Sequence, residues 1–205
     1  SAPDGLRVTG TLGTLSPSQV EGILSRRFPA FERCYGAGTK GARFVGGRMV
    51  LKFRVKRDGS VKTVTVSGGE LGAWPVEACV LKSAATLVFA EPSGGEAVFT
   101  FPVEFPTRSD VELVDEARSR QDLSSARLRE LSLCPTDGAR MPEQVGVVVY
   151  VSVAGEVKST GFTSADGEEP VSAVWAECAK RKILSWTLSD PRGTVRKLKA
   201  LVKVR

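Results

Sequence analysis

Two stretches of the chain alternate apolar and polar residues, and each continues through a glycine turn into a second alternating run. In the first, apolar residues occupy every second position from Met49 to Val55, which is the period of a strand with one buried face. Asp58-Gly59 then favours a tight turn, and residues 61–66 form the return strand. In the second, valines alternate over residues 145–153, and Ala154-Gly155 takes the place of the turn. The pattern predicts two β-hairpins of similar design.

Helical periodicity surrounds the first hairpin. Ser16 and the proline after it mark the start of a helix. Its apolar residues recur at helical spacing, at Val20, Ile23, Leu24 and Phe28. We expect Pro29 to break or kink this helix, which then resumes and presents Cys34. A second helix covers residues 74–87 and carries Cys79.

The same order of elements returns in the second half of the chain. Ser124 or Ser125 caps a helix that carries Cys134, and residues 171–186 form a later helix that carries Cys178. The two halves therefore read as two copies of one design.

A final strand follows in each copy. These strands cover residues 97–105 and 194–205, and residues 6–12 read as a short leading strand of the first copy. Pro102 has no N–H group, which confines the strand at 97–105 to a sheet edge or a bulge.

The repeated order predicts an α+β fold of two tandem small domains. Each is an antiparallel sheet of about three strands, packed by two helices on one face. We place the first domain at residues 1–106 and the second at 124–205. The charged stretch 107–123 between them is a linker or a leading strand, although a capping box from Ser109 to Glu112 would favour a helix.

The cysteines fit this duplication. Cys34 and Cys134 lie on the first helix of each copy, and Cys79 and Cys178 lie on the second. One pair in each copy predicts a disulfide within each domain, and the alternative is four buried free thiols. The chain has no CxxC motif, which argues against a zinc knuckle or a thioredoxin-type redox pair.

Composition narrows the chemistry. The 205 residues include no histidine, so the usual general base near neutral pH and the commonest metal ligand are missing. The carboxylates are scattered, and we expect no catalytic, metal or cofactor site and no small-molecule substrate. No apolar run approaches the ~20 residues of a membrane span, and the first residues lack the apolar core of a signal peptide. We therefore expect any membrane attachment to come from a segment outside this chain.

The net charge of +6 raises the question of polyanion binding. Lys52, Arg54 and Lys56 line one face of the first hairpin strand. The alternative is a solvated face whose charges discourage edge pairing. Sheets that bind nucleic acid interleave aromatic residues with basic ones, whereas Phe53 alternates onto the apolar face. We therefore do not expect nucleic acid as the partner.

The first copy resembles a known family over residues 15–106. The matching residues are Leu15-Ser16, Ile23, Arg33-Cys34-Tyr35, Gly47, Phe53-Arg54-Val55, Asp58-Gly59-Ser60-Val61, Val76 to Cys79-Val80, Phe89-Ala90-Glu91-Pro92, Gly94-Gly95, Val98 and Phe101-Pro102-Val103-Glu104-Phe105. This pattern resembles the C-terminal periplasmic domain of myxobacterial gliding-motility proteins of the AgmX/PglI type, which is itself similar to the C-terminal domain of the energy transducer TonB. The second copy departs from it, with Cys134-Pro135 where the family has Cys-Tyr and with no aspartate before Gly155.

The resemblance implies a non-enzymatic module in the periplasm or cell envelope. It would join a trans-envelope complex, such as gliding motility or TonB-like energy transduction, and bind envelope or outer-membrane proteins. Binding would occur by addition of a partner's peptide strand to a sheet edge. The expected edge residues are Val98, Phe99, Phe101, Val103, Phe105, Leu198, Ala200, Val202 and Val204.

Two other functions stay open at this point. One is polyanion or nucleic-acid binding by the basic strand face. The other is an enzyme with a carboxylate site that the pattern does not reveal.

Overall fold

The computed structural model describes residues 7–8, 13–188 and 193–204. The first repeat contains β1 (Arg7–Val8), α1 (Pro17–Thr39), β2 (Gly47–Val55), β3 (Val61–Gly69), α2 (Trp74–Ala84) and β4 (Ala97–Phe105). The second contains β5 (Glu112–Leu113), α3 (Glu116–Leu123), α4 (Ser125–Ser132), β6 (Gln144–Val151), β7 (Val157–Ser164), α5 (Ala173–Leu184) and β8 (Arg196–Lys203). The strand predicted at residues 6–12 lies outside the described residues apart from β1.

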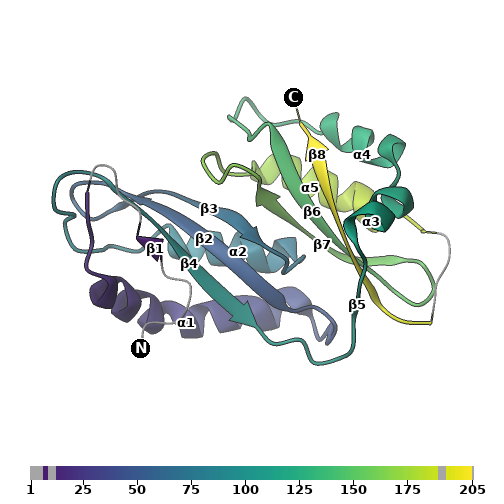
Figure 1. Cartoon of the computed structure of the whole chain (residues 1–205), viewed down its shortest axis with the longest axis horizontal. Coiled ribbons are helices and arrows are strands. Elements are labelled where there is room, and N and C mark those ends of the chain that lie inside the picture. The colour runs from purple at the N-terminus through teal and green to yellow at the C-terminus, as the bar shows by residue number, and fades with distance from the viewer. Residues whose placement is uncertain (1–6, 9–12, 189–192, 205) are drawn as a thin grey trace.

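Each repeat folds into a four-stranded sheet, with strand order β1-β4-β2-β3 in the first and β5-β8-β6-β7 in the second. The helices α1 and α2 pack on one face of the first sheet, α4 and α5 pack on one face of the second, and α3 lies beside β8 (Figure 1). This confirms the predicted α+β class and the two similar units. The short leading strands add one strand to the three expected in each sheet: β1 pairs antiparallel with β4, and β5 pairs parallel with β8.

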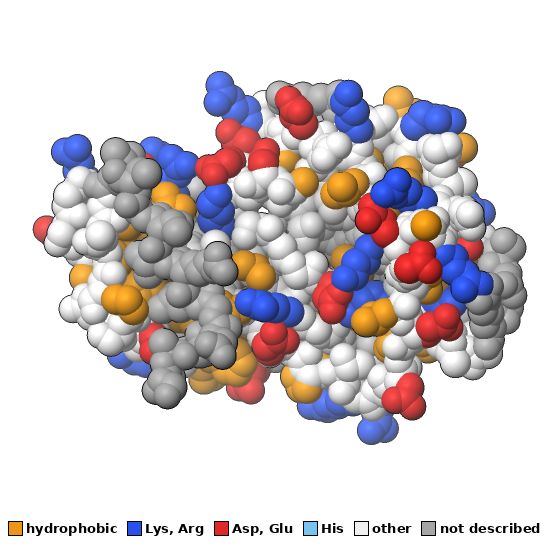
Figure 2. Space-filling model, viewed as in Figure 1, with side chains coloured by type: hydrophobic (Ala, Val, Ile, Leu, Met, Phe, Trp, Pro, Cys, Tyr) orange, Lys and Arg blue, Asp and Glu red, His pale blue; other side chains and the backbone are white. Residues whose placement is uncertain are grey.

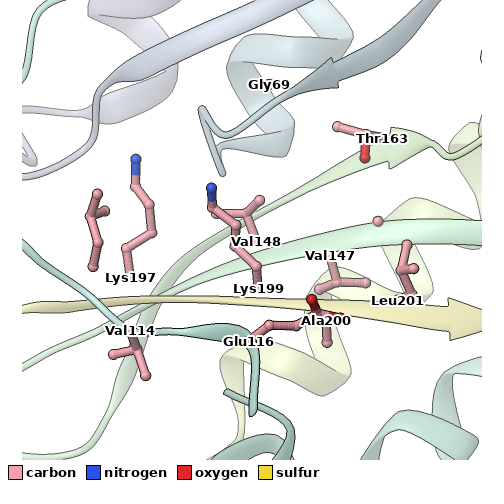
Figure 3. A pocket seen from close by; sticks show the side chains of 12 residues that line it. Gly69, Val114, Glu116, Val147, Val148, Thr163, Lys197, Lys199, Ala200 and Leu201 are labelled. Atoms are coloured by element: carbon pink, nitrogen blue, oxygen red, sulfur yellow. The ribbon is translucent and has the colours of Figure 1, made fainter. Parts of the chain in front are cut away.

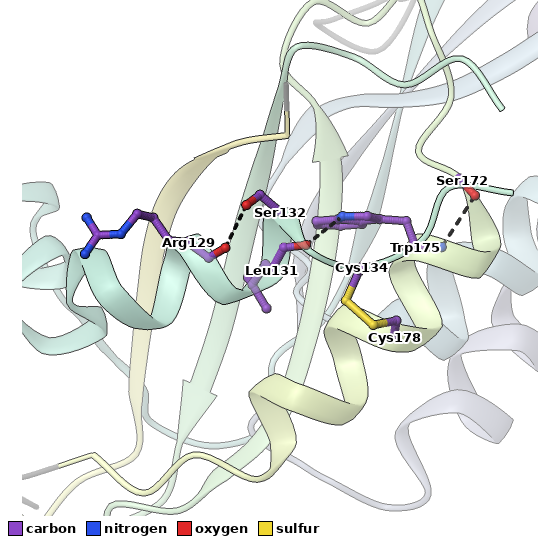
Figure 4. Close-up of a disulfide and its surroundings, with 7 residues drawn as sticks. All are labelled: Arg129, Leu131, Ser132, Cys134, Ser172, Trp175 and Cys178. Carbon is purple, nitrogen blue, oxygen red and sulfur yellow. Dashed lines mark hydrogen bonds between the residues drawn. A yellow bond between two sulfur atoms is a disulfide. The ribbon is translucent and has the colours of Figure 1, made fainter. Parts of the chain in front are cut away.

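One disulfide staples each repeat, as predicted. Cys34 bonds to Cys79 between α1 and α2. Cys134 bonds to Cys178 on α5, and it lies just after the end of α4, whereas the sequence predicts it on the helix. Figure 4 shows the second bond next to Trp175, whose indole N–H donates to the Leu131 carbonyl at 3.0 Å. Disulfides form and persist in oxidising compartments, so the two bonds indicate an extracytoplasmic protein.

The helix α1 runs through Pro29, which the sequence predicts to break or kink it. A proline inside a helix removes one backbone hydrogen bond. Burial on both sides of Pro29 opposes that cost, because Leu24 precedes it and Phe31 follows it in the core. Packing of these residues in the core, beside α2, therefore keeps α1 continuous through Pro29.

The second repeat divides the counterpart of α1 into two helices. Ser124 has a φ of 47°, separates α3 from α4 and caps α4 through its side chain. The break lets α3 pack beside β8, where Ser119 Oγ accepts from the Lys199 N–H at 3.3 Å. Residues 107–123, which the sequence left undecided, thus hold both a strand and a helix, and Asp115 caps the helix.

The two repeats share their hydrophobic cores. Val148 and Tyr150 extend from β6 into the core of the first repeat. Trp74, at the start of α2, packs in the core of the second. Val148 and Tyr150 lie on the face of the second sheet opposite α5. The first repeat therefore covers part of that face.

Candidate functional site

The edge strands β3 and β7 lie at the junction between the repeats, where each is contacted by residues of the other repeat. Glu77, on α2, accepts the Phe162 N–H of β7 at 2.8 Å and the Ala73 N–H at 3.2 Å. Ser159 Oγ donates to the Gly72 carbonyl at 2.7 Å, and Thr65 Oγ1 donates to the Gly167 carbonyl at 2.9 Å. Edge strands that are covered in this way are poor templates for a partner strand.

Glu77 is the most buried acidic group at this junction, with 1% of the residue exposed. A Cβ on Gly161 would lie 2.0 Å from its Oε1, so only glycine leaves room for the carboxylate. Burial raises the pKa of Glu77 to about 7, and the N–H donors of Phe162, Ala73 and Gly72 only partly offset that shift.

The basic strand face lies at the same junction. Glu168, in the loop before α5, forms ion pairs with Lys52 and with Arg54, the latter at 2.9 Å. Lys56 is exposed at the end of the strand. Basic and acidic side chains are interspersed on the face shown in Figure 2. The second repeat thus supplies a counter-ion to Lys52 and Arg54, and binding of a polyanion by this face stays a prediction.

The sequence predicts that the last strand of each repeat offers a free sheet edge, but neither strand is the outermost one in its sheet. β4 lies between β1 and β2, and β8 lies between β5 and β6. Most of their candidate side chains face the cores: Phe99, Val103, Phe105, Leu198, Ala200 and Val202 are buried, and Val98, Phe101 and Val204 are half-buried. The short leading strands β1 and β5, whose sequence pattern is weak, displace both last strands from the edge. A partner strand could reach them only through backbone groups that the leading strands leave unpaired.

A groove of about 470 Å³ lies beside β8, on the face of the second sheet that is directed toward the first repeat. The first repeat borders it through Gly69, at the end of β3, and the segment from β5 to α3 borders it on another side. Figure 3 shows Lys197 and Lys199 pointing from β8 toward the first repeat. The lining residues are Gly69, Leu113, Val114, Glu116, Gly146, Val147, Val148, Thr163, Lys197, Lys199, Ala200 and Leu201.

Exposed leucines give the groove an apolar rim. Leu113 on β5 is 63% exposed and Leu201 on β8 is 55% exposed. Large apolar side chains that stay exposed around one concavity mark binding surfaces more often than scattered ones do. Neither leucine is among the edge residues predicted from the sequence.

The two lysines of the groove are held by the first repeat. Lys197 Nζ donates to the Gly46 carbonyl at 2.9 Å and lies 4.9 Å from the centre of the Tyr150 ring. Burial lowers the pKa of Lys197. Lys199 forms an ion pair with Glu70, and this pair lies at the exposed side of the groove. The groove wall is therefore built from both repeats.

Backbone groups of β8 alternate between the two sides of the strand. The Val195 and Lys197 carbonyls accept from β5 and the residue after it, and the Lys199 N–H donates to Ser119. By the same alternation, the backbone groups of Leu201 and Lys203 point to the outer side. Within the described residues no strand pairs with them there.

The described residues hold no group of three His, Cys, Asp or Glu side chains placed to bind a metal ion. None of the described helices is both long and apolar enough to cross a membrane. Comparison with protein-family models, with curated proteins and with solved structures finds no match to this chain.

Proposed function

We propose that this chain is a non-enzymatic interaction module of a trans-envelope complex, located in the periplasm or cell envelope. It binds an extended segment of an envelope or outer-membrane protein and links that protein to an inner-membrane machine. The resemblance of residues 15–106 to TonB-like and AgmX/PglI-type domains supports this assignment, and the disulfides agree with an oxidising compartment.

The groove between the repeats is the observation that carries the proposal. It is a concave surface with two exposed leucines at its rim, and it lies beside backbone groups of β8 that no described strand pairs with. An extended peptide satisfies both features, because its backbone pairs with a strand while its side chains fill a groove.

Photo-crosslinking in the native envelope tests this function. A photoreactive residue at Leu113 should form an adduct with an envelope protein. The same residue at Leu133 is the matched control, because Leu133 is 79% exposed but lies at the end of α4, outside the groove lining. Equal adduct yields at both positions, or none at Leu113, would contradict the proposal.

A further inference from the structure

We infer that a partner strand adds to the second repeat only, at the outer edge of β8 from Leu201 to Lys203. The partner is an extended segment that places an apolar side chain opposite Leu201 and an acidic side chain opposite Lys203. This inference rests on the proposed function and names the site and the chemistry of the partner.

The same backbone alternation can be followed in the first repeat. The Arg48 carbonyl accepts from Glu70 on the β3 side of β2, so Met49 directs its backbone groups toward β4. Met49 pairs with Val103, and in an antiparallel ladder such pairs alternate. Pro102 and Glu104 therefore direct their backbone groups away from β2, to the outer side of β4.

Pro102 blunts that outer side. It has no N–H group, so the outer edge of β4 lacks a donor at the position that Leu201 fills in β8. The equivalence follows from the pairing, because Pro102 lies opposite Val50 and Leu201 lies opposite Gly146 in the two central strands. Proline on an edge is a known way to prevent strand addition. β8 has no proline and keeps both N–H groups.

The side chains beside this edge indicate the chemistry of the occupant. Leu201 and Lys203 lie on the same face of the sheet as Lys199, since alternate residues of a strand share a face. Lys199 already has Glu70 as a partner, whereas the exposed Lys203 forms no ion pair with a described residue. A segment with an apolar residue opposite Leu201 and an acidic residue opposite Lys203 complements both.

A second copy of this chain is a poorer occupant. Antiparallel pairing of two β8 edges centred on Val202 would place Leu201 opposite Lys203 of the other copy, and it would gather the lysines of both strands on one face. Like charges in neighbouring strands destabilise a sheet. The charge of β8 therefore favours an acidic partner segment over self-association.

Backbone-specific variants test the inference. The probe is a fluorescent nonapeptide, Thr-Val-Thr-Asp-Thr-Val-Thr-Asp-Thr, with the purified full chain. Leu201→Pro removes the outward N–H and should weaken binding at least tenfold, whereas Leu201→Ala keeps the N–H and should weaken it less than threefold. Lys203→Pro is a second variant that removes the next outward N–H, and circular dichroism checks the fold of each. Pro102→Ala restores a donor in β4 and leaves β8 as it is. The affinity of this variant for the peptide should not fall below that of the wild-type chain.

The controls separate the possible failures. A peptide with lysine in place of aspartate should bind at least tenfold more weakly, and equal binding would overturn the acidic preference. Binding that survives both proline variants in folded protein would overturn the edge assignment. If the Leu113 adduct forms in the envelope but no peptide binds, the inference fails and the proposed function stands. If no adduct forms, the proposed function itself fails, and an adduct with the mass of two chains would identify a second copy instead.

Discussion

Replacing all four cysteines by alanine should lower the free energy of unfolding by about 8 kcal/mol and leave most of the protein unfolded at 37 °C. Each disulfide closes a loop of similar length, with sequence separations of 45 and 44 residues. In the chain-entropy account a loop of this size stabilises by about 4 kcal/mol. The two together are comparable with the 5–15 kcal/mol that ordinarily holds a domain together.

Paired variants provide the controls for this result. Removing Cys34 with Cys79, or Cys134 with Cys178, should each cost about half of the total in urea unfolding followed by tryptophan fluorescence. Treatment of the wild-type protein with a reductant should reproduce the loss. A fourfold variant that unfolds at the wild-type urea concentration would show that packing alone holds the repeats.

Raising the pH from 5 to 8 should destabilise the protein by about 2.5 kcal/mol through Glu77. The pKa of Glu77 rises from 4.5 in the unfolded chain to about 7 in the fold. The folded state therefore binds the proton more tightly, and this stability is fully present below pH 4.5 and is lost as the pH rises through 7. No histidine titrates in this window, because the chain contains none.

Glu77→Gln is the matched variant, because it keeps the side-chain shape and removes the titration. Its unfolding free energy should stay nearly constant between pH 5 and 8, whereas that of the wild type should fall. Chemical unfolding at half-unit pH intervals measures both. A pH slope that is unchanged in Glu77→Gln would assign the effect to another group.

The duplication was readable because both copies preserve the same local signals. Alternating apolar residues, a glycine turn and a cysteine on the following helix each have a direct physical meaning, and together they predicted the two hairpins and both disulfides. The short leading strands were harder to predict. Two residues of β5 carry too little periodicity to define a strand, and their pairing is set by the path of the chain between the repeats.

The junction between the repeats was missed for a related reason. Sequence periodicity identifies a buried face but does not identify what covers it. One signal was present: residues 145–151 include apolar side chains on both faces of β6, which is typical of a strand buried on two sides. Val148 and Tyr150 are the residues that the first repeat covers. The carboxylate of Glu77 gave no such signal, because its burial depends on Gly161, 84 residues further along the chain.

The same limit applies to the proposed binding edge. The sequence placed the binding residues on the last strands, and their side chains proved to be mostly buried. The strands β4 and β8 differ in one outward N–H group, which Pro102 lacks, and only the observed register reveals that this position faces outward. Pro102 was identified from the sequence as an edge or bulge residue, and the register then shows that its missing N–H faces outward.

Hydrogen exchange at the outer edge of β8 tests the central claim most directly. In the free chain the Leu201 and Lys203 amides should exchange fast, while those of Ala200 and Val202, which point toward β6, should exchange slowly. Binding of the peptide or of the crosslinked envelope partner should slow Leu201 and Lys203 at least tenfold and leave Glu104 in β4 unchanged. Unchanged exchange at Leu201 and Lys203, or protection that appears at Glu104 instead, would contradict strand addition to β8.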